Sequence, residues 1–331
     1  MDFTNSMLLY TIGLIAGFAL LIYAADKFVL GSARIAQNLG ISPLIIGLTI
    51  VGFGTSAPEM LVSGFAAWEG NPGLSIGNAL GSNITNIALV LGVTALLVPI
   101  GVHSKILRRE LPVLFTLSLA CYWLFLDGEL SRIDGAIMLT LLFLFLAWVI
   151  RSALVAQDRK EDPISEEIEH ELAGHMATKT ALMWCLGGLI GLMIASRLLV
   201  WSAVEIAHLF NVSDLVIGLT IIALGTSLPE LAASIASILK KEDDLAIGNI
   251  IGSNVYNLLA VLSLPGLIHP GIVDPDIISR DFPFMLALTG VLFIMGYGFK
   301  GEGRINRLEG GLLFSAFCGY QFLLFSTLSA T

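Results

Sequence analysis

Charged residues are scarce in this chain of 331 residues: Asp, Glu, Lys and Arg together make up 13% of it, about half the share in a typical soluble protein. Hydrophobic residues make up 56%, and the mean hydropathy is +0.87. An ordinary water-soluble core cannot bury so much apolar surface. The composition also excludes a disordered chain and a nucleic-acid-binding protein. The sequence therefore predicts an integral membrane protein.

Cysteine is scarce as well. Cys121, Cys185 and Cys318 each stand alone in an apolar stretch, with no CxxC pair and no histidine nearby. This excludes a disulfide scaffold and a cysteine-based metal site, and we expect buried thiols that pack as small apolar side chains. A cleavable signal peptide is not predicted, because no basic segment precedes the first apolar run and the run is longer than a signal core. We expect a retained first span.

Long apolar runs, by contrast, are abundant. A bilayer core needs about 20 apolar helical residues, and ten runs approach that length. Continuous Leu, Ile and Phe, as in 137–150, do not alternate with a period of two and so exclude a membrane β-barrel. We predict an all-α protein with ten transmembrane helices. They fall near 7–25, 41–67, 74–98, 110–127, 133–151, 181–204, 213–239, 245–268, 282–299 and 308–328.

Lys and Arg are distributed unevenly between the two sides of this arrangement. With the amino terminus outside, 14 of the 17 basic residues fall on the cytoplasmic side, and only Arg132, Arg197 and Arg280 fall outside. Cytoplasmic loops are enriched in Lys and Arg. We therefore expect both termini outside and an acidic cytoplasmic loop over 152–180.

The chain contains one segment twice. IGLTIVGFGTSAPEMLVS at 46–63 returns as IGLTIIALGTSLPELAAS at 217–234, and IGNALGSNITN at 76–86 returns as IGNIIGSNVYN at 247–257, both at an offset of 171 residues. The offset covers five spans, an odd number, so the second copy must cross the membrane in the opposite sense. Inverted repeats are typical of transporters with a site at the midplane. We predict two inverted five-helix repeats, 1–151 and 181–331; a duplication kept only for stability is the alternative.

Asp26 and Arg197 are also equivalent under this offset, and they fall near opposite faces of the membrane. Long polar side chains near span ends commonly reach toward the interface. We therefore expect these two residues to anchor their spans rather than to couple to transport.

Two carboxylates lie near the middle of predicted spans, Glu59 in the second and Glu230 in the seventh, at equivalent positions of the repeat. A charge at membrane depth costs about 2.5–3.5 kcal/mol or more, and no Lys or Arg lies at the same depth to form an ion pair. Two like charges that converge near the repeat axis repel each other unless a cation or a proton neutralises them. The pair predicts a cation site.

A proline precedes each glutamate, in GTSAPE at 54–59 and GTSLPE at 225–230. Proline lacks an N–H and clashes with the carbonyl four residues before it, so we expect spans 2 and 7 to break there and to free backbone carbonyls. Irregular backbone at this depth is tolerated where it is buried or lines a cavity. Carbonyl, hydroxyl and carboxylate oxygens suit Ca²⁺ and Na⁺ rather than Zn²⁺ or Cu²⁺.

Spans 3 and 8 each carry a polar stripe at equivalent positions. Members four apart, such as Ser82 and Asn86, share one helix face. These side chains can be ligands beside the carboxylates or can hold helices together, and both interpretations stay open for Asn78, Asn83 and their equivalents. The stripes comprise Asn78, Ser82, Asn83, Asn86, Asn249, Ser253, Asn254 and Asn257.

The paired motifs GTSAPE and GTSLPE with GNALGSN and GNIIGSN resemble the α-repeats of the cation/Ca²⁺ exchanger superfamily, in particular those of prokaryotic Na⁺/Ca²⁺ exchangers. The resemblance implies a cytoplasmic-membrane antiporter that carries Ca²⁺ and Na⁺ and uses no cofactor. It implies that Glu59 and Glu230 hold Ca²⁺. The other implied ligands are the carbonyls of Thr55 and Thr226 for Ca²⁺, the carbonyls of Gly52 and Ala223 and the hydroxyls of Ser56, Ser82, Ser227 and Ser253 for Na⁺, and Asn86 and Asn257 at the border of the central site.

The sequence departs from such relatives at two places. Many prokaryotic and K⁺-dependent relatives carry Asp where this chain has Asn257, which disfavours K⁺ co-transport and a proton held there. Cation/H⁺ exchangers carry GNxxE where this chain has GNALG and GNIIG. We predict exchange of Na⁺ for Ca²⁺ by alternating access, with Ca²⁺/H⁺ or other cation antiport as the alternative.

Two further classes fit less well. A cation channel also uses carboxylates, but channels usually combine parallel subunits, and a channel needs no counter-ion on the far side. HELAGH at 170–175 resembles the zinc motif HExxH, yet its histidines are five apart rather than four and lie among acidic residues. We expect a solvated acidic loop there, with a regulatory metal site as the alternative, and no enzyme.

Overall fold

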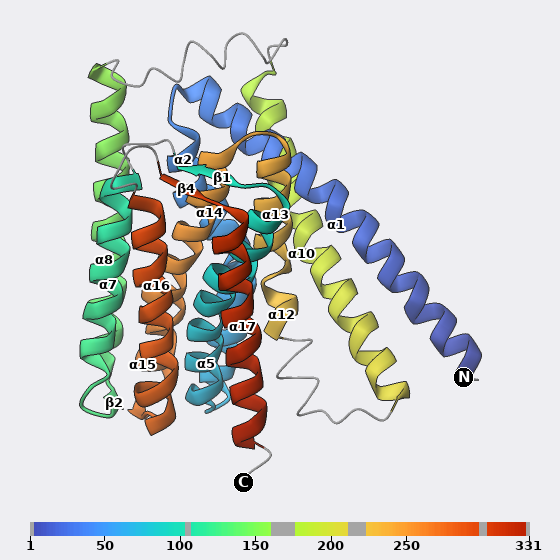
Figure 1. Cartoon of the computed structure of the whole chain (residues 1–331), viewed down its shortest axis with the longest axis vertical. Coiled ribbons are helices and arrows are strands. Elements are labelled where there is room, and N and C mark those ends of the chain that lie inside the picture. The colour runs from blue at the N-terminus through green and yellow to red at the C-terminus, as the bar shows by residue number, and fades with distance from the viewer. Residues whose placement is uncertain (1–2, 103–106, 160–175, 211–222, 298–302, 329–331) are drawn as a thin grey trace.

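The computed structural model describes residues 3–102, 107–159, 176–210, 223–297 and 303–328, and these are almost entirely helical (Figure 1). Two short antiparallel ribbons lie at opposite ends of the molecule. Strand β1 (Ile100–Val102) pairs with β4 (Gly303–Ile305), and β2 (Glu129–Leu130) pairs with β3 (Gly271–Ile272). The start of α1 and the end of α17 lie at the end away from β1 and β4, as expected for termini on one side.

The first half begins with one long helix, continues with two composite helices and ends with two further helices. Each composite helix contains a π-helical segment, η1 or η2. The elements are α1 (Phe3–Leu39); α2 (Pro43–Ile46), η1 (Gly47–Val51), α3 (Gly52–Thr55) and α4 (Ala57–Trp68); α5 (Pro72–Ile84), η2 (Thr85–Leu91) and α6 (Gly92–Leu97); α7 (Leu107–Leu124); and α8 (Arg132–Arg159).

The second half repeats this order. It is described from Thr178 onward, except for 211–222 and 298–302, which lie outside the described residues. The elements are α10 (Thr178–Leu209); α12 (Ala223–Thr226) and α13 (Leu228–Leu239); α14 (Asp243–Tyr256), η4 (Asn257–Val261) and α15 (Ser263–Ile268); η5 (Ile277–Asp281) and α16 (Phe282–Tyr297); and α17 (Arg307–Leu328).

The described helices account for the predicted spans. Seven are long and apolar enough to cross a membrane, and the bent pair Pro43–Thr55 and Ala57–Trp68 makes an eighth. Two shorter apolar helices, Glu110–Leu124 and Leu228–Leu239, occupy the remaining two predicted runs. The prediction of an all-helical membrane protein is confirmed.

One predicted boundary is wrong. The sequence places the end of the first span near residue 25, but α1 continues to Leu39. The charged residues of this extension have partners: Lys27 lies 3.2 Å from Asp26, and Arg34 donates to Gln37 at 2.8 Å. Within the acidic loop expected over 152–180, α8 continues to Arg159 and α10 begins at Thr178, and residues 160–175 lie outside the described chain.

The cysteines follow the expectation in two of three cases. Cys121 and Cys185 are buried, whereas Cys318 is exposed. Cys318 lies on α17, a candidate span of which only 22% of the most apolar stretch is buried inside the protein. An exposed thiol on such a helix faces lipid rather than water.

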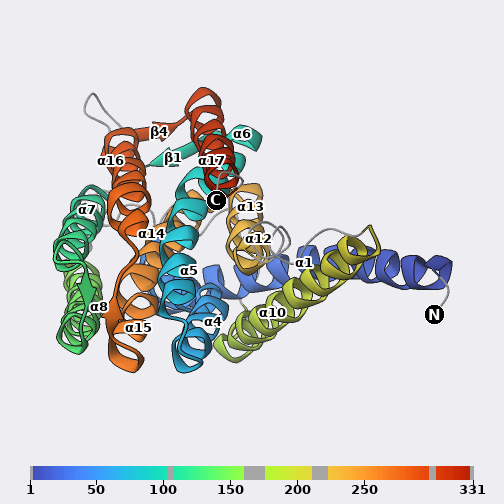
Figure 2. The same cartoon turned by 90° about the horizontal axis from the view of Figure 1, so that it is seen from below.

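Helices α1 and α10 are equivalent in the repeat and pack side by side as an antiparallel pair (Figures 1 and 2). A Cβ on Gly17 would lie 2.8 Å from the Leu199 side chain, and one on Gly188 would lie 2.5 Å from Phe28 N. The offset of 171 turns residue 17 into 188 and 28 into 199, so the two contacts are themselves equivalent. Equivalent helices that run antiparallel mean that the repeats are inverted.

Two spans form the centre of the protein. In Asp243–Ile268, 94% of the most apolar stretch is buried, and in Pro72–Leu97 72%, whereas the other five long spans range from 17% to 33%. The α1–α10 pair lies against α13 near the end with β1 and β4, and it diverges from the remaining described helices toward the other end (Figures 1 and 2). The polar stripes thus lie on the helices that have the least contact with lipid.

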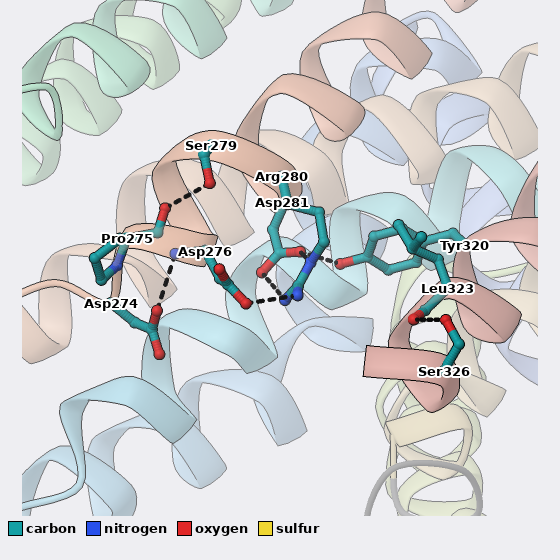
Figure 3. A network of polar contacts seen from close by, with 9 residues as sticks. All are labelled: Asp274, Pro275, Asp276, Ser279, Arg280, Asp281, Tyr320, Leu323 and Ser326. Atoms are coloured by element: carbon teal, nitrogen blue, oxygen red, sulfur yellow. Dashed lines mark hydrogen bonds and ion pairs between the residues drawn. The ribbon is translucent and has the colours of Figure 1, made fainter. Parts of the chain in front are cut away.

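A polar network joins the start of α16 to α17 (Figure 3). Arg280 Nη1 lies 2.8 Å from Asp276 Oδ2, and its Nε lies 2.7 Å from Asp281 Oδ1. Tyr320 OH on α17 donates to the same Asp281 oxygen at 2.8 Å. Asp281 thus links the start of α16 to α17, and Arg280, one of three basic residues expected outside, holds Asp281 in place.

Candidate ion-binding site

The two helices that carry the glutamates are both broken at a serine. Ser56 has φ −82° and ψ 2°, and the equivalent Ser227 has φ −88° and ψ 5°. Each serine is followed by a half-helix with proline in its first turn, a position that proline tolerates. The axis bends by 43° between Pro43–Thr55 and Ala57–Trp68. The break expected from the two prolines is confirmed.

Glu59 and Glu230 lie in the first turns of α4 and α13, and both are 0% exposed. Glu59 lies beside the side chain of Thr226, and Glu230 beside those of Thr55 and Ser56. The amino end of a helix carries a partial positive charge, so each half-helix offsets part of the cost of burying its carboxylate.

All four carboxylate oxygens of this pair are buried and lack a hydrogen bond of good geometry within the described chain. The hydroxyls of Ser56 and Ser227 are in the same condition. Leaving a buried polar group unsatisfied costs about 1–3 kcal/mol, and more for a charged one. A hard cation would satisfy these oxygens, so the donor set fits Ca²⁺ or Na⁺ as transported substrates.

Thr55 connects the broken helix of the first repeat to α14 of the second. Its hydroxyl lies 3.1 Å from Val51 O, 3.1 Å from Asn249 Oδ1 and 3.2 Å from Ser253 Oγ. The predicted ligands Thr55 and Ser253 are therefore brought together, although they come from different repeats.

Asn78 and Asn249 hold the glutamate-bearing helices in place. Asn78 Nδ2 donates to the Glu59 carbonyl at 3.2 Å and to Ser63 Oγ at 2.9 Å. Asn249 makes the equivalent two bonds in the other repeat, at 3.3 and 3.1 Å. These bonds are those that the helix-packing interpretation predicts, and they hold the glutamate-bearing helices against α5 and α14.

The other four asparagines of the stripes behave differently. They are at most 1% exposed, and neither the nitrogen nor the oxygen of any of the four amides has a hydrogen-bond partner in the described chain. Buried amides in proteins are normally paired. The four are Asn86 and Asn257, which are expected at the border of the central site, and Asn83 and Asn254, for which the sequence leaves both roles open. Ser82, the remaining stripe ligand, is buried as well.

The expected backbone ligands are only partly free. Gly52 O accepts a bond from Ser56 N at 3.1 Å, so one of its lone pairs is used within the helix. In the other repeat Ser227 N donates to Leu224 O at 3.2 Å, and Ala223, the first described residue of α12, is not its partner. The two halves thus differ at the carbonyls expected to bind Na⁺.

Two residues outside the predicted set contact the broken helices. Ser196 Oγ on α10 donates at 2.5 Å to the carbonyl of Gly225, four residues before the second proline. Tyr256 OH donates at 3.2 Å to the carbonyl of Thr49 in η1. Neither is matched by an identical residue in the other repeat, so the internal comparison that finds the glutamates gives no signal for them.

Metal clusters of the usual kind are absent from the described residues: no group of three or more His, Cys, Asp or Glu could hold a metal ion. A site with two carboxylates needs carbonyl, hydroxyl or amide oxygens to complete it. The HELAGH segment, 170–175, lies outside the described chain.

Comparison with known proteins agrees with this geometry. The family model of the sodium/calcium exchanger protein matches residues 9–151 and 180–326. The chain is 51% identical to CaxA of Alkalimonas amylolytica, over 97% of this chain and 100% of that protein. It is 44% identical to the inner membrane protein YrbG of Escherichia coli K12, over 87% and 89% of the two chains.

A solved structure of the sodium–calcium exchanger NCX_Mj, soaked with 2.5 mM Na⁺ and 0.1 mM Ca²⁺, superposes with a TM-score of 0.80 at 32% identity. The match covers 94% of this chain and 96% of that one. Matched in both halves by the family model and over nearly its whole length by these relatives, the chain belongs to the sodium/calcium exchanger family of membrane cation antiporters and is not an enzyme.

Proposed function

We propose that this protein exchanges Na⁺ for Ca²⁺ by alternating access. The observation that carries the proposal is the pair of fully buried glutamates whose four oxygens have no hydrogen bond within the described chain. A relative from Methanosarcina acetivorans, 31% identical over 94% of this chain and 97% of its own length, is named sodium/calcium exchanger MaX1. NCX_Mj was soaked with Na⁺ and with Ca²⁺ or Sr²⁺.

In this proposal the two carboxylates bind one Ca²⁺ together with the carbonyls of Thr55 and Thr226. Na⁺ ions replace Ca²⁺ in overlapping sites. Their ligands are the carbonyls of Gly52 and Ala223 and the hydroxyls of Ser56, Ser82, Ser227 and Ser253, while Asn86 and Asn257 border the centre.

Charge explains why exchange is obligatory. One Ca²⁺ balances the two carboxylates, and an empty site leaves both charges unpaired in a medium of low dielectric constant. The empty carrier therefore does not return across the membrane. If an exchange cycle moves net charge, each elementary charge is worth about 2.3 kcal/mol per 100 mV.

We place the protein in the cytoplasmic membrane with both termini outside. The uneven distribution of Lys and Arg supports this orientation, and YrbG, a relative of similar length, is named an inner membrane protein.

The proposal is tested by the uptake of radiolabelled Ca²⁺ into proteoliposomes loaded with Na⁺, with K⁺ or with a proton gradient. We expect uptake only with outward Na⁺, its loss in Glu59→Gln, and its retention in Glu129→Gln, a matched change at an exposed residue of β2. Uptake driven by protons would instead establish the Ca²⁺/H⁺ alternative. Uptake without any counter-ion gradient, with unitary currents, would identify a channel.

A further inference from the structure

The α1–α10 pair is connected to the rest of the protein by an ion pair at one end. Asp26 Oδ1 on α1 lies 2.5 Å from Nζ of Lys240, the residue that ends α13. The side chains are 44% and 31% exposed, respectively. α1 packs against α13, so the ion pair joins two helices that are already in contact.

The internal repeat contains a second pair at the equivalent positions. Adding 171 to 26 gives Arg197 on α10, and subtracting 171 from 240 gives Glu69, which ends α4 as Lys240 ends α13. The acidic Asp26 corresponds to the basic Arg197, and the basic Lys240 corresponds to the acidic Glu69. Each pair therefore still combines one acidic and one basic residue.

This second pair is open in the structure. Glu69 and Arg197 are both exposed, and their side chains make no ion pair with each other. Among the described elements α10 makes no packing against α4 comparable to that of α1 against α13. The two ends of the α1–α10 pair are thus in opposite conditions (Figures 1 and 2).

We propose that Asp26–Lys240 and Glu69–Arg197 are alternating latches, one at each face of the membrane. In inverted repeats each half can adopt the conformation of the other. The contact made here by α1 with α13 is then made in the opposite state by α10 with α4. That exchange breaks the first ion pair and brings Arg197 to Glu69. The inference rests on the proposed alternating-access exchange and adds residues to it that bind no ion.

The strength of the pairs suits this role. Partly exposed ion pairs contribute little, so each latch can break once per cycle and biases the equilibrium between the two states without locking it. Removing one latch shifts that equilibrium by about two- to five-fold.

Cysteine cross-linking tests the latches directly, in the full chain reconstituted in liposomes after replacement of the native cysteines. The pair Asp26→Cys with Lys240→Cys should cross-link readily and stop Ca²⁺ exchange until reduced. The pair Glu69→Cys with Arg197→Cys should also cross-link, during turnover, and stop exchange reversibly. The mismatched pair Asp26→Cys with Arg197→Cys is the control and should not cross-link.

Failure of the second cross-link in protein that exchanges Ca²⁺ would overturn the latch proposal and leave the exchange function intact. Absence of exchange in the uncross-linked background would count against the proposed function instead.

A second measurement uses charge alone. Asp26→Asn and Glu69→Gln should change the ratio of apparent Ca²⁺ affinities at the two membrane faces in opposite directions, each about two- to five-fold. The swap Asp26→Lys with Lys240→Asp should restore the wild-type ratio. Equal effects of the two single variants, or no rescue by the swap, would contradict alternating latches.

Discussion

At the scale of single residues, the candidate site depends on oxygen atoms that have no partner in the described chain. The carboxylates of Glu59 and Glu230 lie at the amino ends of two half-helices, and the amides of Asn83 and Asn254 are buried without a hydrogen bond. Such groups are costly in an apolar interior. Their presence at equivalent positions of both repeats indicates that the cost is kept for binding rather than for folding.

Replacing Glu230 by Gln keeps the shape of the side chain and removes one charge. Because one negative charge then faces a divalent ion, we expect the affinity for Ca²⁺ to fall by about 3 kcal/mol or more, roughly 100-fold. Na⁺ binding should weaken less. Calorimetric titration of both ions checks this, with Glu129→Gln as the control; an equal loss for Na⁺ and Ca²⁺ would show that the charge does not select the divalent ion.

The asparagines should separate into two kinds. Asn78→Ala removes two hydrogen bonds and should lower stability by about 1–2 kcal/mol, measured as thermal unfolding in detergent. Asn83→Ala removes an amide that has no partner in the described chain. It should leave stability nearly unchanged and slow exchange. The opposite ranking would mean that Asn83 is a packing residue.

At the scale of elements, the breaks in the two glutamate-bearing helices place the amino ends of two short helices, α4 and α13, at the candidate ion-binding site. α4 and α13 have 12 residues each, or about 18 Å of helix, too short to cross a bilayer alone. Each half-helix directs its amino end toward the centre, and Ser196 on α10 binds the carbonyl of Gly225 beside one break. Through this hydrogen bond to a backbone carbonyl, the α1–α10 pair contacts the broken helix that carries Glu230.

Pro229→Ala supplies an N–H that can bond the Gly225 carbonyl in competition with Ser196. We expect a straighter helix, higher thermal stability and slower exchange, with little change in Ca²⁺ affinity, because no ligand is removed. Transport assays and melting curves on the same preparation measure both effects. Exchange at the wild-type rate would show that the proline is not needed for the break.

The turn between α13 and α14 should make stability depend on pH. Burial, followed by the nearby Asp244, raises the pKa of Glu242, while Arg34 and Lys240 lower it and Asp243 raises it further. The folded state therefore holds the proton more tightly than the unfolded one, and this contribution, complete below the unfolded pKa, is lost as pH rises through the folded pKa. Glu242→Gln should flatten that part of a melting-temperature profile; an unchanged profile would contradict this assignment.

At the scale of the whole molecule, the sequence predicts most of the architecture because of the internal repeat. The offset that aligns Glu59 with Glu230 also aligns the helices, and an odd number of spans in between requires inversion. Contacts between side chains far apart in the chain could not be predicted. Asp26, for example, was expected to anchor its helix at the interface, but it pairs with Lys240, which lies more than half of the chain away.

For the same reason, the sequence could not predict which asparagines of the polar stripes have hydrogen-bond partners. Asn78 and Asn83 are equally polar and equally repeated. Only the structure shows that Asn78 has two acceptors, the Glu59 carbonyl and Ser63 Oγ, and that the Asn83 amide has no partner in the described chain. The predicted division into 1–151, 152–180 and 181–331 stays a prediction. It is tested by expressing 1–160 and 161–331 together: we expect the two fragments to copurify and exchange Ca²⁺, and separate, inactive fragments would contradict two self-contained repeats.

The burial of α14 has a consequence for how the protein is made. In the span Asp243–Ile268, which begins with α14, 94% of the most apolar stretch is inside the protein. Because so little of this span faces lipid, it can carry the polar side chains of Asn249, Ser253, Asn254 and Asn257. During synthesis, however, it leaves the ribosome before α16 and α17 exist and must enter the membrane with those groups uncovered. Its insertion depends on the half of the chain already in place, so the first repeat serves as the scaffold on which the second is assembled.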